Sequence, residues 1–377
     1  DNTHTKAREK RSRPAKNQKP HSTPHPLPTQ KKETMDIKAR ISQVQQEVDS
    51  LKQRIRSAKE AARDGQLLND KASGLPQQPL KLKGIRTLRG HSQKVYAMQW
   101  CPDPSSNLLI SAGQDGVILV WDALTATKTF GVPLGCLWLM TCSLSPSGNF
   151  AATGGLDNNI SIFKTSELTA TPARTLANHT AHISCVRFLN NQHILSSSGD
   201  KTCRYWDIEA NKVVTKFDQH HGAVLSLAVS PDGNTFVSSS ADQTAKVFDI
   251  RAGNMTQISL TGHTGDIEAT AFFPGGTAIA TGSEDRTAKL YDIRAGQEMI
   301  TYQVNSPVFS LDFSKTGRYL FIAKEDSSNA PGVWDAMRGE EVSTLKGHKD
   351  FVGGIGVSGD GLAVATSSWD NMLKVWS

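Results

Sequence analysis

The chain has 377 residues, with 42 lysines and arginines against 36 acids and a formal net charge of +6. No apolar run approaches the roughly 18 residues that a membrane helix requires, and the polar, basic N-terminus shows no secretory signal pattern. The five cysteines are odd in number and form no Cys-x-x-Cys pair. This usage favours buried thiols in a reducing compartment, so we expect a cytoplasmic protein.

Residues 1–34 form a polar arm with nine Lys or Arg, three acids and five prolines. The arm alone carries a charge of +6, so the remaining 343 residues are neutral in sum. Such a segment cannot bury enough apolar surface to fold, and we expect it to be disordered. Attraction to anionic lipid or nucleic acid is the alternative, but the neutral remainder predicts no nucleic-acid partner. Met35 is a candidate start, which would make residues 1–34 an upstream extension.

Residues 35–64 are predicted to form one coiled-coil helix. Apolar residues recur at alternating spacings of four and three, which is the a/d pattern of a coiled-coil seam. So narrow a stripe needs a partner, either a separate helix or, as the alternative, the chain's own repeat region. Residues 65–83 contain glycines and prolines and are predicted to be a connector. The seam residues are Ile37, Ile41, Val44, Val48, Leu51 and Ile55.

Residues 84–377 repeat one pattern seven times. The repeat predicts an all-β fold, a seven-bladed WD-repeat β-propeller of four-stranded blades. Aromatic residues recur at gaps of 42 or 43, at Trp121, Phe163, Trp206, Phe248, Tyr291, Trp334 and Trp376. An aspartate lies six residues earlier in most units, at Asp115, Asp157, Asp200, Asp242, Asp285 and Asp370. A histidine opens several units, at His91, His179, His263 and His348, with His220 or His221 in the fourth.

These histidines and aspartates are interpreted as structural. The Asp can accept a hydrogen bond from the His, and a Ser or Thr on the middle strand can link that His to the Trp indole N–H. A catalytic role is disfavoured because the pair repeats without a unique nucleophile beside it. No cluster has metal-ligand spacing, and no cofactor is expected. The stretch Ile85–Leu88 is predicted to complete the last blade and remove its free edge.

Two units depart from the pattern. The second lacks the opening His and reads Leu137-Trp138-Leu139-Met140 instead. In the sixth, Asp326 lies eight residues before Trp334, which indicates a two-residue insertion in a blade that otherwise survives.

Several strings resemble one family, the β subunits of heterotrimeric G proteins, over about Met35 to the end. They include Thr87-Leu88-Arg89-Gly90-His91, Trp138-Leu139-Met140-Thr141-Cys142 and Ser368-Trp369-Asp370. The resemblance implies a non-enzymatic signalling subunit that forms an obligate dimer with a lipidated γ subunit. It also implies that the top of the ring binds the GDP-bound α subunit and effectors in receptor signalling, at the inner face of the plasma membrane.

By the same resemblance, a set of positions would face the α subunit and effectors. Four positions depart from the family pattern: His182 replaces Tyr, Ala223 an acid, Glu268 Asn, and Phe351 a frequent Arg. Losing the acid at position 223 predicts the loss of one charged contact. The implied interface is Lys94, Tyr96, Trp138, Met140, Leu156, Asn158, Thr180, His182, Leu225, Asp266, Glu268, Glu284 and Trp369.

Two other functions fit parts of this sequence. A corepressor-type scaffold would use residues 35–64 to self-associate and the ring to bind transcription factors. An enzyme built on a propeller would place a cluster of unlike polar residues in the central channel, and the sequence offers no unique cluster of that kind.

Overall fold

The computed structural model describes residues 43–51, 53–54, 57, 82–167 and 171–377. Residues 43–51, 53–54 and 57 are helical and belong to one compact unit, and the strands belong to a second. The predicted boundaries after residues 34 and 64, and the seam residues Ile37, Ile41 and Ile55, lie outside the described residues. No helix in the described part is long and apolar enough to cross a membrane.

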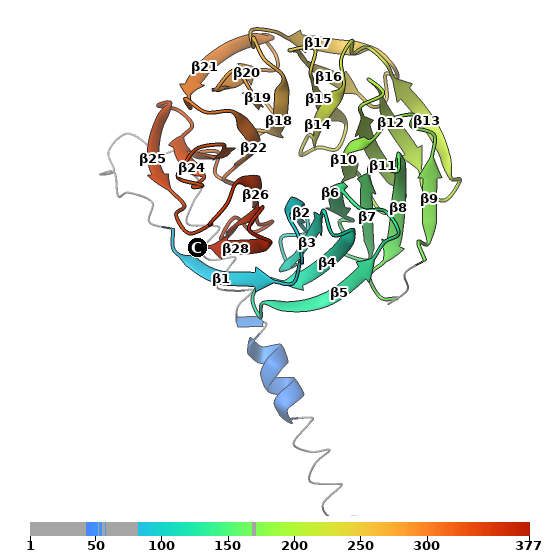
Figure 1. Ribbon diagram of the computed structural model, residues 1–377, viewed down its shortest axis with the longest axis vertical. Coiled ribbons are helices and arrows are strands. Elements are labelled where there is room, and N and C mark those ends of the chain that lie inside the picture. Colours follow the sequence, from blue (N-terminus) through green and yellow to red (C-terminus); the bar gives the residue numbers. More distant parts are fainter. Residues whose placement is uncertain (1–42, 52, 55–56, 58–81, 168–170) are drawn as a thin grey trace, which may run out of the picture. The chain divides into compact units, whose positions relative to one another are not determined.

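The second unit is a ring of seven four-stranded antiparallel sheets (Figure 1). Each sheet is one blade, and the strands nearest the centre of the ring in Figure 1 are β2, β6, β10, β14, β18, β22 and β26. The seven-bladed propeller that the repeats predict is confirmed. The sixth blade, with its longer turn before Trp334, keeps its four strands.

The strands are numbered along the chain, and each blade begins with its inner strand. Blade 1 comprises β2 (Val95–Trp100), β3 (Leu108–Gly113), β4 (Val117–Asp122) and β5 (Thr127–Pro133). Blade 2 comprises β6 (Leu139–Leu144), β7 (Phe150–Gly155), β8 (Asn159–Lys164) and β9 (Arg174–Ala177). Blade 3 comprises β10 (Ile183–Phe188), β11 (His193–Ser198), β12 (Cys203–Asp207) and β13 (Lys212–Phe217). Blade 4 comprises β14 (Val224–Val229), β15 (Thr235–Ser240), β16 (Ala245–Asp249) and β17 (Thr256–Leu260).

The remaining blades follow the same order. Blade 5 comprises β18 (Ile267–Phe272), β19 (Ala278–Ser283), β20 (Thr287–Asp292) and β21 (Gln297–Gln303). Blade 6 comprises β22 (Val308–Phe313), β23 (Tyr319–Lys324), β24 (Gly332–Asp335) and β25 (Glu340–Thr344). Blade 7 comprises β26 (Val352–Val357), β27 (Val364–Ser368) and β28 (Met372–Trp376). Its fourth, outer strand is β1 (Gly84–Arg89), the first strand along the chain.

Strand β1 closes the ring. It pairs antiparallel with β28, and Leu88 lies opposite Leu373. Beyond the strands, Lys83 N donates to Ser377 O at 2.9 Å and Ser377 N donates to Lys83 O at 3.1 Å. The prediction that this N-terminal strand completes the last blade is confirmed. Blade 7 therefore has an outer strand like the other six, and β28 is covered by β1 and does not form the edge of its sheet.

The hydrophobic core lies between neighbouring blades. In one such zone Ile110, Val120 and Phe130 of blade 1 pack with Leu139 and Phe163 of blade 2. Burying an aliphatic or aromatic side chain of this size contributes roughly 1.5–3 kcal/mol. The second strands are buried along their whole length or along all but the first residue, because a neighbouring blade covers each of their faces.

A bulge near the start of each inner strand turns one residue out of the ladder. In every blade the pairing register shifts between the first and third residues of the inner strand. A bulge re-aims the extra side chain, and because all inner strands run in the same direction these residues meet at one end of the central channel. We call them the ring mouth: Tyr96, Met140, Ser184, Leu225, Glu268, Phe309 and Gly353.

Candidate functional site

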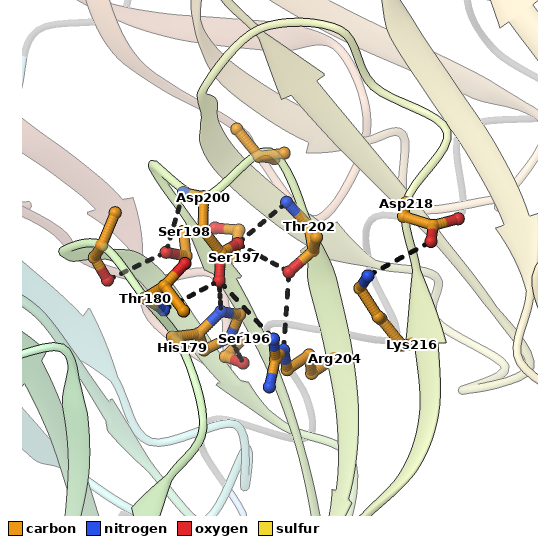
Figure 2. Close-up of polar contacts among 12 residues, drawn as sticks. His179, Thr180, Ser196, Ser197, Ser198, Asp200, Thr202, Arg204, Lys216 and Asp218 are labelled. Carbon is orange, nitrogen blue, oxygen red and sulfur yellow. Dashed lines mark hydrogen bonds and ion pairs between the residues drawn. The ribbon is translucent and has the colours of Figure 1, made fainter.

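The repeated histidines and aspartates form buried hydrogen-bond networks, which blade 3 illustrates (Figure 2). Trp206 Nε1 donates to Ser196 Oγ at 2.8 Å, and Ser196 Oγ lies 2.8 Å from His179 Nε2. His179 Nδ1 lies 2.7 Å from Asp200 Oδ2. The chain of donors is complete if His179 is neutral with its proton on Nδ1. Burial lowers the pKa of His179, which favours that neutral form.

Asp200 collects several donors in this network. Its carboxylate accepts from Thr180 N at 3.1 Å, Thr202 N at 3.0 Å and Thr202 Oγ1 at 2.6 Å, besides His179. Burial alone would raise the pKa of Asp200, but the hydrogen bonds from His179 and Thr202 outweigh it and hold that pKa well below its usual range. The Asp200 side chain is only 5% exposed, so these contacts serve the blade and leave little surface for a ligand.

Four more blades repeat the arrangement. The His-to-Asp distances are 3.1 Å in blade 1, 2.9 Å in blade 4, 2.7 Å in blade 5 and 2.9 Å in blade 7. In blade 4 the structure resolves the choice that the sequence leaves open, because His220 and not His221 fills the slot. These pairs are His91 with Asp115, His220 with Asp242, His263 with Asp285, and His348 with Asp370.

Blade 6 replaces the histidine network with an ion pair. The buried ammonium of Lys324 lies 3.4 Å from Asp326 and 3.1 Å from Glu341. Trp334 keeps the aromatic position, but its indole N–H has no acceptor among the described residues. Sequence reasoning identified the insertion but missed Lys324, because a lysine at the end of a strand gives no signal of burial.

The predicted interface residues divide between the ring mouth and its rim. Six of them line one central channel with a volume of about 1920 Å³. Lys94 lies over Trp369, Thr180 is in the His loop of blade 3, and Asn158, Asp266 and Glu284 lie on exposed or half-buried turns. Leu156 lines a different cavity, in blade 2. The six channel residues are Tyr96, Met140, His182, Leu225, Glu268 and Trp369.

A continuous aromatic cluster runs along this end of the ring across four blades. Tyr96 stacks on Trp138 with ring centroids 5.8 Å apart and meets Trp369 edge-on at 6.2 Å. Trp369 meets Phe351 at 4.9 Å, and Phe351 meets Phe309 at 5.0 Å, both in T-shaped geometry. The ammonium of Lys94 lies 3.7 Å from the centre of the Trp369 ring. We call these five rings the aromatic cluster.

Phe309 and Phe351 extend the cluster beyond the predicted interface. Phe309 is the bulged residue of β22, and Phe351 precedes β26 directly. The signal for Phe309 in the sequence is its place one residue into an inner strand, the place that Tyr96 has in blade 1. That signal becomes readable only when the bulge is known.

Trp138 is the most solvent-exposed residue of the cluster, because the other four are half-buried. Its side chain is 41% exposed, beside Leu137 at 59%. Its φ of 66° lies in the left-handed region, which a bulky residue rarely adopts. Backbone strain of this kind costs about 1–3 kcal/mol and is concentrated at binding sites. The loop therefore holds an indole ring toward solvent at a cost to the fold.

Glu268 is the one ionisable residue in the ring mouth apart from Tyr96. Burial is the main cause that raises the pKa of Glu268, to about 7, and the nearby carboxylates of Glu284 and Asp266 add to the effect. At neutral pH this side chain is therefore divided between its neutral and ionised forms.

We expect Glu268→Gln to be more stable than the wild type, by a margin in the free energy of unfolding that grows as the pH rises. The pKa of an unfolded Glu is about 4.3, and the folded state binds the proton more tightly, so wild-type stability falls between about pH 4.5 and pH 7. After allowance for screening at this half-buried site, the variant should be about 1–2 kcal/mol more stable at pH 8. Urea unfolding at pH 5 and pH 8 measures the difference. An equal difference in the free energy of unfolding between variant and wild type at pH 5 and pH 8 would contradict the raised pKa of Glu268.

The described residues contain no group of three or more His, Cys, Asp or Glu side chains that could hold a metal ion. The five cysteines are free; Cys136 is half-buried, and the other four are buried. The arrangement offers a broad aromatic surface with acidic neighbours, which is chemistry for binding another macromolecule.

Comparison with known proteins places these features in context. The sequence profile described as "G protein beta WD-40 repeat protein" matches residues 38–377. The chain is 44% identical over 349 residues to the guanine nucleotide-binding protein subunit beta of Dictyostelium discoideum, covering 91% of this chain and 99% of the relative. It is 45% identical over 342 residues to the guanine nucleotide-binding protein G(I)/G(S)/G(T) subunit beta-1 of Homarus americanus, covering 89% and 99%.

Proposed function

This chain belongs to the family of heterotrimeric G-protein β subunits, and on that premise we propose how it engages its partners. It is a non-catalytic subunit, and its partners are G-protein subunits. The corepressor-type scaffold is not favoured. Our proposal is that its helix pairs with a γ subunit and that the aromatic cluster binds the GDP-bound α subunit and, after release, effectors.

The γ-subunit proposal rests on the helical residues of the first unit. Val44, Val48 and Leu51 are 57%, 42% and 46% exposed, although all three are apolar. They follow one another at spacings of four and three, so they lie on one face of the helix. An exposed apolar stripe of this kind gains stability by packing against a second amphipathic helix. Ile37, Ile41 and Ile55 would continue the same stripe.

We expect Val48→Asp to weaken co-purification with the γ subunit by about tenfold or more. Burying an unpaired carboxylate in the seam would cost at least roughly 1–3 kcal/mol. Gln46→Asp is the matched control, because it places the same charge on the same helix at a position outside the stripe. Co-expression with a tagged γ subunit and quantitative pull-down measure the effect. Equal losses for both variants would indicate helix destabilisation and contradict the seam.

The α-subunit proposal rests on one observation, the aromatic cluster at the ring mouth. Large rings with solvent-exposed edges are the residue types that dominate binding energy at interfaces. Lys94 lies over Trp369, and the acids Asp266 and Glu284 lie near Glu268 of the ring mouth. Such a surface fits a partner segment with apolar side chains flanked by a basic residue. The other proposed contacts are Met140, Leu156, Asn158, Thr180, His182, Leu225 and Glu268.

The experiment that tests this proposal compares nucleotide states. The chain, purified with its γ subunit, should retain an α subunit loaded with GDP and release it when a non-hydrolysable GTP analogue is added. Retention that does not depend on the nucleotide would count against the proposal. We further propose that the complex acts at the inner face of the plasma membrane, where the lipid on its partners supplies the attachment.

A further inference from the structure

Blade 2 carries a glycine where five other blades carry their structural histidine. The histidines lie four residues before the inner strand, as His179 does before Ile183. In blade 2 that position is Gly135, four residues before Leu139. The outer strand of the preceding blade gives the same residue. In β13, Phe217 lies three residues before His220. Val132 has the equivalent register in β5 and lies three residues before Gly135.

The rest of the network position is retained in blade 2. Thr153 and Phe163 have the places in β7 and β8 that Ser196 and Trp206 have in blade 3. Asp157 lies two residues after the end of β7, as Asp200 does after the end of β11. The blade thus keeps the groups that would surround an imidazole and lacks the imidazole itself.

An open cavity is found at this place. A Cβ atom added to Gly135 would meet no atom within 4 Å. The cavity has a volume of about 550 Å³, which is in the range of small-molecule sites. Its walls include the apolar side chains of Leu134, Leu139, Leu156 and Phe163.

Two polar groups in the walls, Thr153 and Asp157, offer free acceptor lone pairs, and Cys136, Asn159 and Ser161 complete the polar lining. Thr153 Oγ1 donates its proton to Thr141 O at 2.8 Å, so its lone pairs remain available. Phe163, unlike Trp206, has no N–H to supply them. Asp157 Oδ1 accepts from Asn159 N at 3.3 Å, and its Oδ2 accepts no hydrogen bond from any residue in the described part of the chain. In blade 3 the equivalent oxygen accepts from His179 and Thr180.

From this geometry we propose that the blade 2 cavity binds a small planar organic cation of the amidinium or guanidinium class. Such a group has two N–H donors in one plane, one for the free oxygen of Asp157 and one for Thr153. Asp157 is the single charged residue among the described residues that line the cavity, so the site favours a positive ligand. Apolar atoms attached to the cation would pack against Leu139 and Phe163.

The test uses benzamidinium as the probe and benzamide, its neutral isostere, as the control. Cys136 lines the cavity and is the single cysteine of the chain that is not buried, so its alkylation rate reports occupancy. Benzamidinium should slow alkylation of Cys136 in a saturable manner on the full chain with its γ subunit, and benzamide should not. Equal protection by both compounds, or no protection by either, would overturn the proposal.

Two variants locate the binding. Asp157→Asn removes the charge and keeps the shape, and should weaken benzamidinium at least about tenfold. Gly135→His fills the slot with the side chain that other blades carry, and should abolish saturable protection while alkylation by a small reagent can still be measured. Melting temperatures of both variants check folding. An unchanged dissociation constant in either folded variant would contradict the assigned site.

Discussion

Replacing Asp200 with alanine is expected to lower the free energy of unfolding by about 3–5 kcal/mol, the range for breaking a buried charged pair by removing one partner. The substitution leaves His179 Nδ1 without its acceptor and removes the bonds from Thr180 and Thr202. It also removes the negative charge opposite Arg204, whose guanidinium lies 3.7 Å from the Asp200 carboxylate. His179, Thr202 and Arg204 are buried, so they lose this partner without access to water, whereas Thr180 is exposed.

The same substitution at Asp157 is the matched control. Asp157 has the same register in blade 2, but there is no histidine for it to accept from, and its side chain is exposed. We expect Asp157→Ala to cost under about 1 kcal/mol, as surface substitutions do. Denaturant unfolding of the two variants measures the contrast. Similar losses would show that the aspartate acts through its turn alone and not through the histidine network.

The pH dependence of the Asp200 effect follows from the direction of its pKa shift. The pKa of Asp200 is lower in the folded state than in the unfolded chain, where it is about 3.9. Its stabilisation is therefore fully present above that value and is lost as the pH falls through the folded pKa. Asp115, Asp242, Asp285 and Asp370 are shifted in the same direction. The difference between wild type and Asp200→Ala should accordingly narrow in acid.

The ring itself could be predicted from sequence because its determinants are local and repeated. A period of 42 or 43 residues shows the blades, and the pairing of a His loop with an Asp turn follows from the need to satisfy buried polar groups. Closure by β1 was likewise predictable, since the last unit ends on its third strand and the first unit is preceded by a fourth. These inferences need only the residue pattern of the repeats and their order along the chain.

The candidate site was harder to predict because it depends on where the repeats differ. Phe309 looks like an ordinary strand residue until the bulge in β22 turns it toward the ring mouth. In the sequence Phe351 stands out only as a departure from a family pattern, and its contact with Phe309 joins two blades. The cavity in blade 2 results from a missing side chain at Gly135, and an absence of this kind has no positive signal in a sequence.

The aromatic cluster leads to the strongest prediction for binding. Trp369 is its centre, because it contacts Tyr96 and Phe351 through their rings and Lys94 through its ammonium. If the proposed α-subunit interface is correct, Trp369→Ala should weaken binding of the GDP-bound α subunit by about 2–4 kcal/mol, roughly 30- to 700-fold in the dissociation constant. The loss combines the missing contact area with the release of Tyr96 and Lys94 from fixed orientations.

Two measurements separate this effect from simple loss of fold. Met337→Ala removes a side chain that is 73% exposed in the turn between β24 and β25, and it should leave both binding and melting temperature unchanged. Trp369 is half-buried and lines the central channel, so its removal should cost far less stability than Asp200→Ala. Surface-immobilised α subunit with GDP gives the dissociation constants, and calorimetry gives the melting temperatures. A Trp369→Ala ring that melts as early as Asp200→Ala would reassign this tryptophan to the core, whereas weakened binding by a stable ring requires it at the interface.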